Sequence, residues 1–201
     1  NSPNNSPIEP PGISKCLGLP SVDNLVAKIG LLHQALKLAK LPHAFGGALA
    51  LAWCTERARG TIDIDINILI PDADYQLGVE ALPADVKVTK KDLQLLKRDG
   101  QARVWWHKTP VDLFFNSTDF HSQLLDRIRW ESFAGQRIPF LSCYDLAVFK
   151  AFFNRTKDWA DLEEMYAVGT LNIEQVQATL IHYLGADDER ILQLGKLREL
   201  T

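Results

Sequence analysis

The clearest pattern in the chain is a strict alternation of polar and apolar residues from Thr61 to Ile68. Isoleucines occupy positions 62, 64, 66 and 68, whereas Thr61, Asp63, Asp65 and Asn67 occupy the other face. A period of two predicts a β-strand with one apolar face and one carboxylate-bearing face.

Shorter alternating or apolar segments predict further strands. Residues 101–107 and 111–115 indicate an antiparallel pair joined at a Thr109–Pro110 turn, with Asp112 on its second strand. Residues 43–45 indicate a short strand that runs into Gly46-Gly47 and then into an alanine- and leucine-rich helix. Less regular extended segments are expected near residues 86–88 and 137–140.

Helical periodicity accounts for most of the remaining chain. Apolar residues recur at helical spacing after Ser21, which is a suitable N-cap, and Pro42 follows the end of this helix. Further helices are expected at 72–81, 91–98, 119–130, 142–154, 158–168, 172–184 and 187–199.

These elements predict an α+β fold with a small mixed sheet, flanking helices and a helical C-terminal region. Residues 1–20 are rich in Pro, Asn and Ser and are expected to form a disordered tail. The expected divisions are this tail, an α/β core at 21–118 and the helical region at 119–201.

Composition narrows the functional classes. The chain has 201 residues, 46% of them hydrophobic, and a formal charge of -3, which gives no basic field for coating nucleic acid. It has neither a long apolar run nor a secretion signal, so we expect a protein with no membrane segment, located in the cytoplasm. Three cysteines without C-x-x-C spacing predict neither a disulfide framework nor a zinc site.

Asp63 and Asp65 are the first candidates for chemistry, because both project from one face of the strand. Carboxylates held so close repel each other unless a cation neutralises them. Magnesium suits such a site, and two ions can serve a phosphoryl displacement, with Asp112 as a third carboxylate. The alternative is that these acids are solvated or paired with Arg57 and Arg59.

Gly46-Gly47 is a candidate phosphate site. A glycine turn that opens a helix lets backbone N–H groups approach a phosphate at the positive end of the helix dipole. The alternative is a tight strand-to-helix turn with no ligand.

Taken in order, these motifs resemble the polymerase β nucleotidyltransferase superfamily. The run 59–65 and the later Asp145…Lys150…Arg155-Thr156-Lys157-Asp158…Asp161 are similar to its AbiEii-type branch, which includes toxins of bacterial toxin–antitoxin pairs. The resemblance spans roughly residues 43 to 165. The chain departs from it in having Gly47 where many relatives have serine.

The resemblance implies a role for each matching residue. Gly46 and Gly47 would hold a triphosphate, Asp63 and Asp65 would bind both metal ions, and Asp112 would help to activate an acceptor hydroxyl. The residues expected to line the nucleotide or acceptor side are Arg59, Thr61, Lys150, Arg155 and Lys157. Without the resemblance, Asp158 is equally well explained as a charge at a helix N-terminus that pairs with Arg155 or Lys157.

The implied reaction is the magnesium-dependent transfer of a nucleoside monophosphate from a nucleoside triphosphate to a hydroxyl. The acceptor is a small molecule, an RNA or a protein, and an antitoxin is a further expected partner. The alternative is a protein that keeps the fold as a binding or regulatory module without turnover. His43 and His107 are expected to be structural, because neither has metal-ligand spacing or an adjacent nucleophile.

Overall fold

The computed structural model describes residues 24–57 and 60–200. The expected tail, the expected N-cap Ser21 and the candidate residue Arg59 lie outside these ranges. The helices are α1 (Leu25–Leu38), α2 (Gly47–Thr55), α3 (Tyr75–Glu80), α4 (Lys90–Asp99), α5 (Asp119–Ser122), α6 (Cys143–Phe153), α7 (Thr156–Ala167), α8 (Ile173–Leu184) and α9 (Glu189–Lys196), with 3-10 turns η1 (Asp72–Asp74), η2 (Leu124–Arg127) and η3 (Leu197–Leu200). The strands are β1 (His43–Phe45), β2 (Ile64–Pro71), β3 (Val86–Lys87), β4 (Gln101–Trp106), β5 (Thr109–Asn116), β6 (Arg129–Phe133) and β7 (Gln136–Phe140).

The seven strands form one mixed sheet in the order β3-β4-β5-β2-β1-β7-β6. β2 pairs in parallel with β5, and β1 pairs in parallel with β7, whereas the other neighbours are antiparallel. The α+β prediction with a mixed sheet and a helical C-terminal part is confirmed.

The alternation in the sequence determines the two faces of this sheet. Ile64, Ile66 and Ile68 are fully buried, and the inward residues of β5 join them in the core. Ile62 precedes the strand and is 76% exposed, so its predicted place on the apolar face is wrong. Asp65 and Asp112 project from the opposite face.

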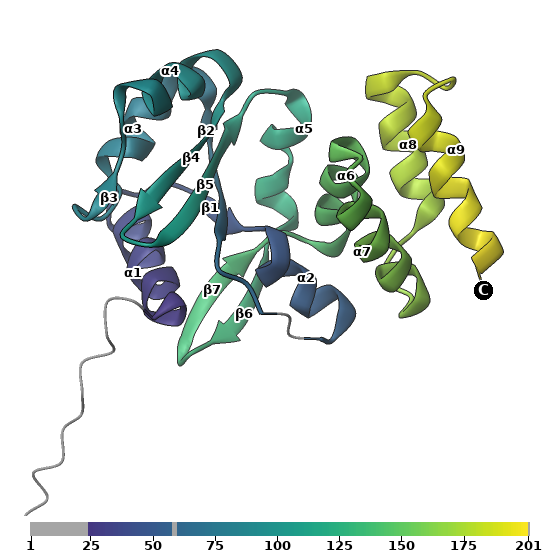
Figure 1. Cartoon of the computed structure of the whole chain (residues 1–201), viewed down its shortest axis with the longest axis horizontal. Coiled ribbons are helices and arrows are strands. Elements are labelled where there is room, and N and C mark those ends of the chain that lie inside the picture. The colour runs from purple at the N-terminus through teal and green to yellow at the C-terminus, as the bar shows by residue number, and fades with distance from the viewer. Residues whose placement is uncertain (1–23, 58–59, 201) are drawn as a thin grey trace, which may run out of the picture.

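Figure 1 shows α1, α3 and α4 on one side of the sheet, and α2, α5 and the C-terminal helices on the other. The apolar face packs against the first group, as shown by Gly78 of α3, where an added Cβ would meet the Phe115 ring. Lys28 of α1 is buried on the same side, and its Nζ donates to Trp106 O at 3.1 Å and to Thr109 Oγ1 at 2.8 Å. The carboxylate face is therefore directed toward α2 and the C-terminal helices.

Two local predictions are wrong. The β4–β5 turn lies at His107–Lys108 rather than Thr109–Pro110, and His107 has a positive φ of 54° there. The helix expected over 119–130 ends early, and β6 begins at Arg129. β6 and β7 form an antiparallel hairpin that adds to the sheet next to β1, so the sheet extends into the region expected to be helical.

Cys54 and Cys143 form a disulfide with Cα atoms 5.5 Å apart, which corrects the expectation of no disulfide. The bond joins the last turn of α2 to the first turn of α6. Sequence spacing could not reveal it, because the two cysteines lie 89 residues apart and become neighbours only through packing. Among the described residues, no helix has the length and apolar character needed to span a bilayer.

Candidate functional site

The candidate site is built on a row of residues across three neighbouring strands. Asp65 of β2 is the register partner of Asp112 of β5, and Asp112 is the register partner of Arg103 of β4. Register partners in adjacent strands project from the same face and lie about 5 Å apart. Asp63 precedes β2 by one residue and joins the row through Arg103, whose Nη2 donates to Asp63 Oδ2 at 3.0 Å.

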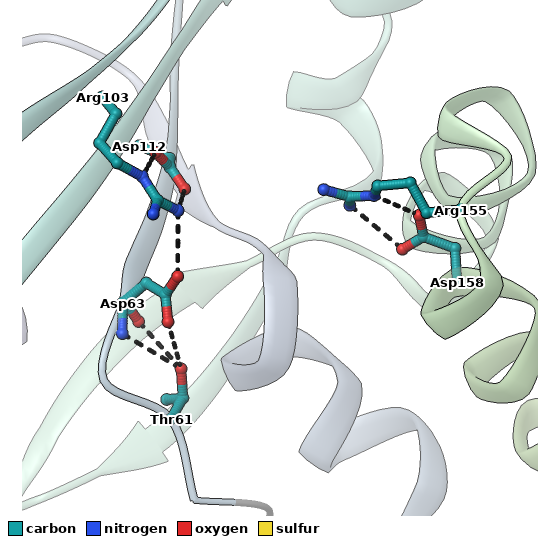
Figure 2. A network of polar contacts seen from close by, with 6 residues as sticks. All are labelled: Thr61, Asp63, Arg103, Asp112, Arg155 and Asp158. Atoms are coloured by element: carbon teal, nitrogen blue, oxygen red, sulfur yellow. Dashed lines mark hydrogen bonds and ion pairs between the residues drawn. The ribbon is translucent and has the colours of Figure 1, made fainter.

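Arg103 is the residue that the sequence analysis missed. Its Nε and Nη2 each donate to one oxygen of Asp112 at 2.7 Å, and Nη2 also reaches Asp63 (Figure 2). The alternative of an ion pair thus holds for Asp63, whose partner among the described residues is Arg103, and no such pair is seen for Asp65. Arg57 lies 3.4 Å from Glu164 instead.

Asp65 differs from its neighbours in having no side-chain hydrogen bond to any of the described residues. Burial, and then the nearby charges of Asp112 and Asp63, raise the pKa of Asp65 to about 6, while Lys150 and Lys157 act in the opposite direction. The protein thus keeps a partly buried carboxylate that ionises less readily than a solvated aspartate.

The glycine turn lies directly against this carboxylate. Gly46 N–H donates to Asp65 O at 2.9 Å, and Gly46 is the N-cap of α2. Gly47 has a φ of +53°, and an added Cβ would overlap Asp65 Oδ2 and lie 2.5 Å from Asp65 Cγ. Glycine is required for both reasons, so serine at position 47 would not fit this conformation.

Lys150 and Arg155 face the row from the C-terminal helices, where they form a cluster with two acids. Lys150 Nζ lies 2.6 Å from Asp161 Oδ2 and 3.6 Å from Asp158 Oδ1. Arg155 Nε donates to Asp158 Oδ2 at 2.6 Å. This confirms the alternative that Asp158 pairs with Arg155, and it shows that Lys150 is a buried ion-pair partner.

Arg155 is the more available of the two cations. More than half of its side chain is exposed, and Figure 2 shows its guanidinium extending from α7 toward the strands. The pKa of Arg155 is raised by its hydrogen bond to Asp158, and the charges of Asp65 and Asp112 add to this effect. The charge of Arg155 thus interacts with the carboxylates of Asp65 and Asp112.

A cavity of about 420 Å³ separates the two groups. Gly46, Gly47, Asp65, Lys150 and Arg155 line its polar end. Its remaining wall is mostly apolar and carries aromatic rings, among them Phe114, Phe120, Phe149, Phe153 and Tyr183. A pocket with convergent polar groups at one end and apolar walls elsewhere suits a small ligand with a charged part and a flat apolar part.

The other predicted site residues lie around this region. Thr61 Oγ1 donates to Asp63 O at 3.2 Å and accepts from Asp63 N–H at 3.3 Å, so it shapes the loop before β2. Lys157 is exposed on the first turn of α7, and its charge reaches Asp65. Of the predicted site residues that the structure describes, five line the cavity, whereas Asp63, Asp112, Thr61 and Lys157 lie outside its lining.

The two histidines lie elsewhere. His43 is buried, its Nδ1 lies 2.8 Å from Leu41 O and its Nε2 lies 2.9 Å from His33 Nδ1, so a neutral ring satisfies both contacts. Burial lowers the pKa of His43 to about 4. His107 is exposed in the β4–β5 turn.

The residue types suit a hard divalent cation, because Mg²⁺ prefers carboxylate oxygens and Asp65 has no side-chain hydrogen bond to any of the described residues. However, Asp63, Asp65 and Asp112 are not arranged around one common point in the structure. Within the described ranges, no three side chains among His, Cys, Asp and Glu are gathered as a metal site. Arg103 holds both oxygens of Asp112 and one oxygen of Asp63, so a metal would have to share or replace these contacts.

Comparison with known proteins identifies the fold. No protein-family model and no curated protein sequence matches the chain. An antigenic nucleotidyltransferase-like protein from Paracoccidioides brasiliensis is similar in structure, with a TM-score of 0.51 and 15% identity, over 86% of this chain and 93% of that one. The antibiotic-resistance factor ANT(2'')-Ia has a TM-score of 0.52 and 14% identity, over 88% of this chain and 97% of its own. The chain therefore has a fold of the nucleotidyltransferase type.

Proposed function

We propose that this protein is a nucleotidyltransferase that transfers a nucleoside monophosphate from a nucleoside triphosphate to a hydroxyl group. The observation that carries the proposal is the register of Asp65 with Asp112, beside a glycine turn and at the polar end of a cavity. Asp65 lies against the N-terminus of α2 without a side-chain hydrogen bond to any described residue, and it shares the cavity with Lys150 and Arg155, as expected of a site for a cation and a phosphate.

In the proposed reaction, the acceptor oxygen forms a bond to the α-phosphorus as the bond to the bridging oxygen breaks and pyrophosphate leaves. Asp112 accepts the proton of the acceptor hydroxyl. Gly46 and Gly47 leave the start of α2 open for backbone contact with the phosphates, and Arg155 offers guanidinium donors from the opposite wall. The aromatic wall of the cavity would hold the nucleoside by stacking.

Asp63, Asp65 and Asp112 would hold Mg²⁺, with two ions expected. When bound, Mg²⁺ supplies positive charge that neutralises both the carboxylates and the phosphates. The chain's own contribution is to place these groups rigidly, because positioning and charge neutralisation dominate such displacements.

The test supplies the protein with each of four α-labelled nucleoside triphosphates, Mg²⁺ and a cell extract. Label should pass to one fraction with the wild type and not with Asp65→Asn. Asp188→Asn is the matched control, because Asp188 is a partly exposed acid paired with Arg190 on the C-terminal helices. Absence of transfer from all four nucleotides would contradict the proposal.

The labelled fraction identifies the acceptor. Small-molecule, RNA and protein fractions are separated before counting. A toxin role with an antitoxin partner, which the AbiEii resemblance implies, would be supported if expression arrests growth with the wild type but not with Asp65→Asn.

The alternative is a nucleotide-binding or regulatory protein without turnover. Arg103 favours this alternative, because it occupies two of the three carboxylates. Nucleotide binding without any labelled product would support it.

A further inference from the structure

We infer that Arg103 takes the place of a metal cation beside Asp63 and Asp112. It bonds to both carboxylates in the metal-free protein and releases them when a divalent ion binds. Arg103 is thus a positioning residue that competes with metal. The inference rests on the proposed function, since it concerns how that site accepts its ion.

The contacts themselves support competition. A planar guanidinium bonds to both oxygens of Asp112, and the same Nη2 reaches Asp63. A metal ion needs oxygens from these same carboxylates. An arginine that bonds both oxygens therefore restricts the directions from which Asp112 can coordinate.

The charges support it as well. Asp63 and Asp112 both bond to the one guanidinium of Arg103, so these two carboxylates keep an excess of negative charge that Arg103 only partly offsets. A guanidinium stays protonated at any ordinary pH, so the positive charge of Arg103 is fixed. A fixed positive charge this close also repels an approaching divalent ion.

The position of Arg103 allows it to yield. Its side chain is 49% exposed, against 19% for Asp112, because it projects from the uncovered face of β4. It does not line the cavity. Arg103 can therefore turn toward solvent without disturbing the core, whereas Asp112 cannot.

The first experiment measures Mn²⁺ binding to the metal-free protein, without nucleotide, by the loss of the free-ion paramagnetic resonance signal. Arg103→Gln should bind Mn²⁺ on the order of tenfold more tightly, because it removes a charge that repels the ion at short range. Arg103→Lys keeps the charge and should stay near wild type. Arg190→Gln is the matched control, since Arg190 makes the same two-oxygen contact with Asp188.

The second experiment makes its measurement on the wild type and needs a variant only to assign the signal. The Nε–H of Arg103 is hydrogen-bonded to Asp112, and its nitrogen-15 signal, assigned by its absence in Arg103→Lys, should exchange slowly with solvent. Adding Mg²⁺ should speed this exchange severalfold.

The outcomes separate the two proposals. If the wild type binds Mn²⁺ and Arg103→Gln binds it with equal or lower affinity, the proposed function stands and the inference about Arg103 is overturned. Mg²⁺ binding that leaves the Arg103 signal unchanged would overturn it too. If the wild type and Arg103→Gln bind no Mn²⁺, or bind it at a site that Asp65→Asn leaves intact, the metal-dependent function itself fails. If Arg103→Gln binds Mn²⁺ and the wild type does not, the inference about Arg103 is supported most strongly.

Discussion

Replacement of Asp65 by asparagine should stabilise the metal-free protein while it abolishes function. In the fold the pKa of Asp65 is about 6, whereas the ordinary value is 3.8. At pH 8 the folded protein must therefore hold an ionised carboxylate that the unfolded chain ionises more easily. The difference corresponds to roughly 3 kcal/mol as an upper bound, so we expect a gain of about 1–3 kcal/mol for Asp65→Asn.

The pH dependence has a definite sign. Because the pKa of Asp65 is raised in the fold, its contribution to stability is fully present below pH 3.8 and is lost as the pH rises through 6. Asparagine does not titrate. The advantage of Asp65→Asn should therefore be near zero at pH 4, grow between pH 4 and 6, and be constant above that range.

The assay is urea unfolding with chelator present, at pH 4 and at pH 8. Asp112→Asn is the comparison: it breaks a two-oxygen contact with Arg103 but also removes a charge that repels Asp65, so it should stabilise the protein less than Asp65→Asn does. With Mg²⁺ and nucleotide added, only the wild type should gain stability. If Asp65→Asn is less stable than the wild type at pH 8 with chelator, the reasoning about this carboxylate is refuted.

Three further predictions concern other residues. Lys150→Ala should lower the free energy of unfolding by roughly 3–5 kcal/mol, because it removes the buried cation that bonds to Asp161 at 2.6 Å and lies near Asp158, whereas Arg155→Ala, at a half-exposed position, should cost far less; equal losses in urea unfolding would argue against this. Gly47→Ser should lower the free energy of unfolding by about 1–3 kcal/mol, because position 47 has a positive φ and the new Cβ would overlap the Asp65 carboxylate. Gly60→Ser, with open space around it, should leave the free energy of unfolding unchanged in the same assay. Lowering the pH from 7 to 5 should destabilise the wild type by roughly 2 kcal/mol more than His43→Gln, because the unfolded chain takes up a proton that the buried ring excludes until about pH 4; parallel thermal melts that stay together would contradict it.

Much of the fold could be predicted from the sequence, because local patterns determine it. The alternation at 61–68 identified β2 and the face that carries its acids, and helical periodicity placed α6 and α8 within one residue of their observed ends. The hairpin of β6 and β7 was missed in part. Its strands carry arginine, glutamine and glutamate among the apolar residues, and this pattern gives no clear period.

Arg103 was missed because of the error in the hairpin turn. A turn at Thr109–Pro110 would place His107 opposite Asp112. The observed turn at His107–Lys108 places Arg103 there. A shift in the turn thus changed the cross-strand partner of a key residue, and only the structure reveals that this partner is a cation.

Lys150 shows a different limit of sequence reasoning. A lysine near two acids on the following helix fits both a phosphate contact and a buried ion pair. Which of the two applies depends on burial, and Lys150 is only 7% exposed. Burial at the junction of α6 and α7 depends on how those helices pack, which is a property of the whole fold.

The three-strand row also has a consequence for the order of folding. Arg103 and Asp112 are nine residues apart in one hairpin, whereas Asp65 must join by a parallel pairing that spans a much longer loop. Short-range contacts form sooner than long-range ones. We therefore expect Asp112 to be neutralised within the hairpin before β2 arrives. The second acidic strand can then dock without meeting an unshielded carboxylate, so the same arginine that resists the metal ion eases the assembly of the chain.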